Sequence, residues 1–154
     1  MKTLINRQVL FTAVVAGGSL GIFLKVVEHL TNRRVYTLLL NVDYFPILHN
    51  YYFPEIIEFS FHLVISLVIT SCLFAIRNKF NWSNTALIRS SIVSQLLIGC
   101  VLFPTTILSD RTPAITDVHA LAWWLSGHLL FGLLVGILLR RSTGQFSNWQ
   151  FLKK

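Results

Sequence analysis

The sequence predicts an all-α membrane protein in which four transmembrane helices form a bundle with both termini in the cytoplasm. Hydrophobic residues make up 54% of the 154 residues and charged residues only 12%, about half of what a soluble domain carries. Four apolar stretches each approach the ~20 residues that a helix needs to cross the hydrocarbon core. Because the basic residues form short clusters between these stretches rather than one charged face, they indicate membrane topology and not nucleic-acid binding.

We expect the whole chain, residues 1–154, to form a single integral membrane domain. The predicted spans cover residues 9–27, 55–76, 86–108 and 118–139. The first span follows Lys2 and Arg7 as a signal peptide would, but its apolar character continues to Val27, which favours an uncleaved helix. The second and third spans are joined by the short polar stretch "RNKFNWSN".

The distribution of charge predicts the orientation. With a cytoplasmic N-terminus, the basic residues on the inner side are Lys2, Arg7, Arg77, Lys79, Arg89, Arg140, Arg141, Lys153 and Lys154. Lys25, Arg33, Arg34 and Arg111 remain on or toward the outer side. The acidic residues all fall on the outer side or at its border: Glu28, Asp43, Glu55, Glu58, Asp110 and Asp117. The positive-inside rule therefore predicts an inner (plasma) membrane protein with both termini cytoplasmic.

Residues 28–54 predict an aromatic-rich outer segment between the first and second spans. The stretch is too apolar for a disordered linker, and its two prolines make it too short and interrupted to span the bilayer. We expect a partly helical cap at the outer interface, with Tyr36, Tyr44, Tyr51 and Tyr52 at headgroup level. A cap in this position could act as a lid over the bundle.

Small residues recur every four positions in the first and fourth spans. They are Ala13, Gly17 and Gly21 in the first span and Gly132 and Gly136 in the fourth. Such stripes let helix backbones approach closely in lipid. We expect them to mediate packing within one bundle, in a homo-oligomer, or with another membrane partner.

The second span begins with an unusual polar stripe of Glu55, Glu58 and His62. At about 100° per residue, these side chains fall within roughly 60° of one another on the helix. An ionisable residue in a membrane helix is costly unless it meets a partner or water, and this makes it a candidate functional residue. The candidate ligand-binding or relay residues are Lys25, Glu28, Glu58, His62, Asp117 and His128.

Three hypotheses remain open for these residues. In the structural one, Lys25 pairs with Glu58, and the chain serves as a structural or accessory subunit. In the second, Glu58, His62 and His128 line an outward-facing pocket that binds or moves a small polar ligand or ion. In the third, the chain is a membrane-embedded enzyme: the same three residues hold a divalent metal, or His62 and His128 ligate a haem. The sequence does not decide whether a reaction is catalysed or which cofactor is bound.

Overall fold

The computed structural model describes residues 6–42, 51 and 53–140, and these residues contain helices and no strands. The elements are α1 (Arg7–Thr31), α2 (Val35–Leu40), α3 (Glu55–Phe80), α4 (Asn84–Leu102), the 3₁₀ helix η1 (Phe103–Leu108) and α5 (Val118–Arg140). Four helices in this part of the chain are long and apolar enough to cross a membrane: α1, α3, α4 with η1, and α5. The predicted all-α class and the four candidate spans are confirmed to this extent.

Local sequence signals define most helix ends. The side chain of Asn6 accepts a hydrogen bond from the Val9 amide at 2.9 Å and caps α1. α1 and α3 each end at an asparagine in the left-handed conformation, Asn32 with φ 55° and Asn81 with φ 49°. Asparagine adopts this conformation more readily than other non-glycine residues, so it suits a helix C-terminus. Pro104 lies where α4 tightens into η1 and cannot donate the next helical hydrogen bond.

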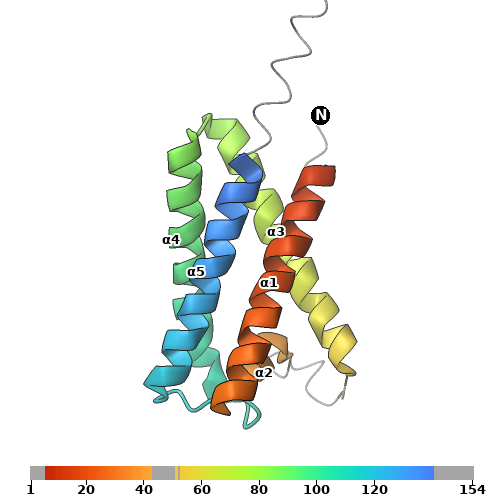
Figure 1. Cartoon of the computed structure of the whole chain (residues 1–154), viewed down its shortest axis with the longest axis vertical. Helices are drawn as coiled ribbons and strands as arrows, with labels where there is room; N and C mark the ends of the chain where they lie inside the picture. The colour runs from red at the N-terminus through yellow and green to blue at the C-terminus, as the bar shows by residue number, and fades with distance from the viewer. Residues whose placement is uncertain (1–5, 43–50, 52, 141–154) are drawn as a thin grey trace, which may run out of the picture.

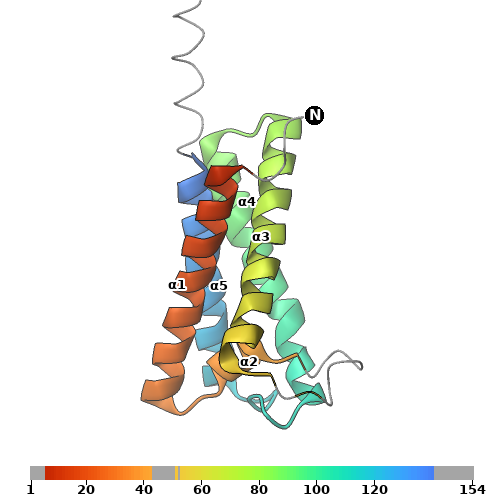
Figure 2. The same ribbon diagram turned by 90° about the vertical axis from the view of Figure 1, so that its right-hand side faces the viewer.

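The long helices are arranged so that chain neighbours are not always spatial neighbours (Figures 1 and 2). α1 packs against both α3 and α5, α5 packs against α4, and α3 makes few contacts with α4 despite the short turn between them. The short helix α2 lies at the end of the bundle where α1 ends and α3 begins. We call this the α2 end; the α3–α4 turn and the start of α1 lie at the opposite end.

The small-residue stripes pack inside the bundle but do not face each other. A Cβ on Gly132 would lie 2.8 Å from the Ser91 carbonyl oxygen of α4, and one on Gly136 would lie 2.9 Å from Ile88 Cα. Gly17 instead faces α3, where a Cβ would lie 2.9 Å from Ser66 Oγ. Each stripe therefore contacts a different helix.

Only part of the predicted cap falls in the described residues. α2 occupies residues 35–40, and Tyr51 stacks on Phe53 with ring centroids 6.0 Å apart. Asp43, Tyr44, His49 and Tyr52 lie outside the described residues, as do Lys2, Arg141, Lys153 and Lys154. An interfacial aromatic cap and a lid function stay predictions.

Candidate functional site

The inward face of α3 is polar. Its buried residues are Glu58, His62, Ser66, Thr70, Leu73 and Arg77. Steps of three and four residues place these side chains on one face of a helix. Large apolar side chains of the same helix are exposed, including Ile56, Val64 and Val68. α3 thus has a polar inner face and an apolar outer face, the reverse of a helix in a water-soluble protein.

Hydrogen bonds to neighbouring helices hold much of this polar face. His62 Nε2 donates to the Gly17 carbonyl oxygen at 3.1 Å, and Ser66 Oγ donates to the Ala13 carbonyl oxygen at 2.8 Å. At the opposite end, Arg77 Nη1 donates to the Leu139 carbonyl oxygen at 2.7 Å. α3 is therefore joined to α1 and α5 by side chains that bond to backbone carbonyls.

The other spans add buried polar side chains to the same core. Together we call this set the polar interior: Thr12, Glu58, His62, Ser66, Thr70, Arg77, Ser91, Gln95 and His128. Thr12 Oγ1, Thr70 Oγ1 and Gln95 Nε2 are buried, and no hydrogen-bond partner for them occurs among the described residues. A buried polar atom without a partner costs about 1–3 kcal/mol, so its presence calls for an explanation.

His62 and His128 are both buried in the core. The His128 ring lies 4.4 Å from that of Trp124. His128 Nδ1 donates to the Trp124 carbonyl oxygen at 3.0 Å. Because a carbonyl oxygen only accepts hydrogen bonds, the proton lies on Nδ1 of His128 and on Nε2 of His62. The second ring nitrogen of each neutral histidine keeps a lone pair that can take up a proton.

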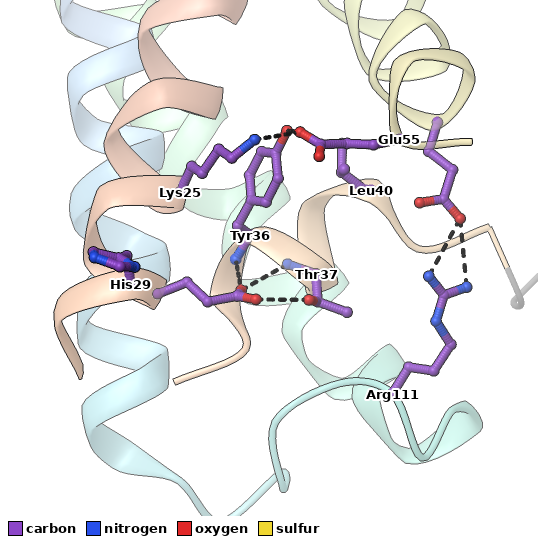
Figure 3. A pocket seen from close by; sticks show the side chains of 9 residues that line it. Lys25, His29, Tyr36, Thr37, Leu40, Glu55 and Arg111 are labelled. Atoms are coloured by element: carbon purple, nitrogen blue, oxygen red, sulfur yellow. Dashed lines mark hydrogen bonds and ion pairs between the residues drawn. The ribbon is translucent and has the colours of Figure 1, made fainter. Parts of the chain in front are cut away.

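A pocket of about 400 Å³ opens at the α2 end (Figure 3). It is lined by Lys25, Glu28, His29, Tyr36, Thr37, Leu40, Glu55, Glu58 and Arg111. The Glu28 carboxylate accepts hydrogen bonds from the amides of Tyr36 and Thr37 at 2.7 and 2.8 Å and from Thr37 Oγ1 at 2.8 Å. It thereby satisfies free amides in the first turn of α2. Glu28 lines the pocket, but its oxygens are engaged in holding α2.

The expected pair between Lys25 and Glu58 is wrong. Lys25 Nζ instead contacts Glu55 Oε1 at 2.5 Å, and Tyr36 Oη donates to the same oxygen at 2.8 Å. Glu55 lies beside Lys25, and we call these two exposed side chains the rim of the pocket; Glu58 lies on the buried face of α3. Burial, and then the Glu55 carboxylate, raises the pKa of the Tyr36 phenol, so Tyr36 stays a donor.

Glu58 lies where the pocket meets the polar interior. Its side chain is 6% exposed and faces Arg111, whose Nη1 and Nη2 lie 3.4 and 3.3 Å from Glu58 Oε1. These distances exceed the 2.7–2.9 Å of a close charge-assisted hydrogen bond. Glu58 is thus a buried carboxylate held loosely by an arginine that the sequence analysis did not place in the site.

Asp117 does not line the pocket. It forms an ion pair with Arg33 and accepts a hydrogen bond from the Ala120 amide at 3.0 Å at the start of α5. The Arg33 guanidinium holds the pKa of Asp117 below its usual range. Asp117 therefore joins the α1–α2 connection to α5, away from His128.

The structure does not assemble Glu58, His62 and His128 as a three-ligand metal site. Among the described residues, no group of three or more His, Cys, Asp or Glu side chains could hold a metal ion. Cys72 and Cys100, which lie in apolar runs, are free and exposed on the outer surface of the bundle.

Comparisons with known proteins add no relative. No protein-family model matches the chain, and neither the curated proteins nor the solved structures contain a match.

Proposed function

We propose that the chain is a plasma-membrane protein that binds a small polar ligand or ion in the pocket at the α2 end and moves it through the polar interior. The inner face of α3, which is polar at every buried position except Leu73, carries this proposal. From Glu58 to Arg77 the helix advances 19 residues, or about 28 Å at 1.5 Å per residue. That length nearly equals the ~30 Å hydrocarbon core. A polar face of this length supports a route rather than an isolated buried group.

The charges of the described residues support placing the α2 end outside. All of their acidic residues belong to that end: Glu28, Glu55, Glu58, Asp110 and Asp117. Three basic residues there form ion pairs with acidic ones: Lys25 with Glu55, Arg33 with Asp117 and Arg111 with Glu58. Arg7, Arg77, Lys79, Arg89 and Arg140 lie toward the opposite end. The positive-inside rule then favours cytoplasmic termini.

A proton is the ion that this interior suits best. Glu58 lines the pocket and belongs to the buried face of α3, so a proton that enters the pocket meets its carboxylate first. The second ring nitrogens of His62 and His128 can accept the proton next, and the hydroxyls of Ser66 and Thr70 can both donate and accept. Water or a transported polar group in the interior would also supply partners for the buried hydroxyls and amide.

Arg77 closes the route at the opposite end. Its guanidinium bonds to the Leu139 carbonyl oxygen of α5 and, at 3.2 Å, to Asn84 Oδ1 of α4. A fixed positive charge opposes the passage of a cation. Movement across the whole membrane therefore requires Arg77 to change partners, whereas binding at Glu58 does not.

The test is proton flux into proteoliposomes that contain a trapped pH-sensitive dye. After an external acid pulse, wild-type vesicles should acidify at least about tenfold faster than empty ones, and Glu58→Gln should remove most of the difference. The matched control is Asp117→Asn, which neutralises a carboxylate at the same end of the bundle that does not line the pocket. Thermal unfolding of each variant verifies that it is folded.

Two results would overturn the route. One is wild-type flux no faster than that of empty vesicles; the other is a Glu58→Gln rate equal to the wild-type rate. If flux is absent but small cations or polar solutes raise the wild-type Tm and not that of Glu58→Gln, movement is refuted while binding stands.

A haem-dependent enzyme is the second candidate. It is favoured by His62 and His128, because each donates one ring N–H to a backbone carbonyl, as metal-ligating histidines usually do. Purified protein with a Soret band that His62→Ala removes would establish it. Colourless protein would exclude it.

A further inference from the structure

A second cavity adjoins the pocket at the α2 end. It is a groove of about 420 Å³ between α1 and α3, and it shares Lys25, Tyr36 and Glu55 with the pocket. Its other lining residues are Gly21, Ile22, Ile56 and Phe59. The two cavities therefore meet at a charged rim, and the groove continues as an apolar surface.

The groove changes from polar to apolar with depth, as the bilayer does. α1 runs toward the α2 end and α3 runs away from it. Gly21 precedes Lys25 by four residues and Phe59 follows Glu55 by four, so both apolar residues lie about 6 Å deeper than the charged rim. The Phe59 ring lies against Gly21, where a side chain would displace it. The groove is thus polar at the membrane surface and apolar below it.

The apolar part of the groove is reached from the side of the bundle. Ile22 is 67% exposed and Ile56 is 75% exposed, although both belong to helices that are candidate membrane spans. In a bilayer these side chains face lipid rather than water. A ligand with a hydrocarbon chain can therefore enter the groove from the membrane.

The rim carries one charge of each sign. The side chains of Lys25 and Glu55 are 58% and 57% exposed, and the Tyr36 hydroxyl bonds to the same carboxylate. An exposed ion pair contributes little to stability, so a ligand that brings both charges can replace it. A phosphate suits Lys25, and a primary ammonium suits Glu55 because it can donate hydrogen bonds to a carboxylate.

We propose that this groove binds a phospholipid with a zwitterionic, primary-amine headgroup of the phosphatidylethanolamine type. The phosphate contacts Lys25, the ammonium contacts Glu55, and one acyl chain lies along Gly21, Ile22, Ile56 and Phe59. The lipid comes from the leaflet at the α2 end. This site does not depend on the proposed route, since it requires neither Glu58 nor the polar interior.

The experiment compares single-chain phospholipids of equal chain length added to the full chain in detergent. Lysophosphatidylethanolamine should raise the Tm at about tenfold lower concentration than the choline or glycerol analogue, because each analogue lacks an ammonium N–H donor. Ile22→Trp, which fills the groove, should abolish this preference. Val14→Trp is the matched control, since Val14 is also exposed on α1 but does not line the groove.

A second variant keeps the test decisive if Ile22→Trp does not fold. Glu55→Gln replaces the charged acceptor for the ammonium by a neutral, weaker one, and it should greatly reduce the difference between the ethanolamine and choline lipids. Equal effects of all three lipids on the wild type would overturn the proposal. So would an unchanged ethanolamine preference in folded Ile22→Trp or in Glu55→Gln.

Discussion

The α4–α5 interface and the α1–α3 interface are both lined by small residues, but they are built differently. At the first, Gly132 and Gly136 bring α5 against the backbone of α4, where an added Cβ would meet the Ser91 carbonyl oxygen or Ile88 Cα at 2.8–2.9 Å. At the second, Gly17 meets the Ser66 side chain, and hydrogen bonds join α3 to α1. Around Gly132 and Gly136 the contact is backbone against backbone, whereas around Gly17 it is side chain against backbone.

This difference suggests a division of roles. Close backbone contact gains dispersion energy but leaves no room for side chains at the glycine positions themselves. Polar contacts keep Ser66 and His62 buried beside α1, and they continue the polar face that begins at Glu58. The α4–α5 contact at Gly132 and Gly136 is thus suited to stability, and the α1–α3 interface combines packing with the candidate site.

The largest expected effect comes from filling the α4–α5 interface. Gly132→Ala should destabilise the protein by about 3 kcal/mol, since the new methyl group meets α4 backbone that cannot turn aside. Reversible unfolding in mixed micelles measures the change. Gly18→Ala is the control, because a Cβ there has no atom within 4 Å. Equal losses for the two variants would refute the proposed backbone contact.

A smaller effect is expected from the α1–α3 interface. Ser66→Ala removes the hydrogen bond to Ala13 and should cost about 0.6 kcal/mol, the average measured for such bonds between membrane helices, and at most about 1.7 kcal/mol. The same unfolding experiment applies. The control is Ser60→Ala, whose hydroxyl bonds only to the Ile56 carbonyl oxygen of its own helix. If Ser60→Ala costs as much as Ser66→Ala, the bond to α1 does not stabilise the interface.

The smallest effect should come from the Arg33–Asp117 ion pair, which lies outside both interfaces. Since Arg33 lowers the pKa of Asp117 in the folded state, the pair stabilises the protein above the unfolded carboxyl pKa of about 3.9. That contribution is lost as the pH falls through the lower folded pKa. The Tm difference between wild type and Asp117→Asn should therefore shrink from pH 5 toward pH 3, as thermal scans can measure. A difference that stays constant or grows would contradict the assignment.

The candidate site was only partly predictable. The spacing of Glu58, His62 and Ser66 predicts that they share one face of the helix. Thr70 follows Ser66 by four residues, and this spacing was a further signal in the sequence. Arg111 could not be found in this way, because it reaches Glu58 across 53 residues of chain. The sequence likewise could not show that Lys25 pairs with Glu55 and not with Glu58, because this depends on which side of α3 faces α1.

By itself, the sequence determined four apolar helices and a concentration of acidic residues near one end, because length, hydropathy and helical periodicity are local properties. The tertiary structure decided which faces meet: the stripes of α1 and α5 contact different helices, and Glu28 caps α2 instead of facing a ligand. The polar interior also depends on all four spans. Helix association in lipid depends on the fit of particular side chains, and this fit exists only after the helices are placed side by side.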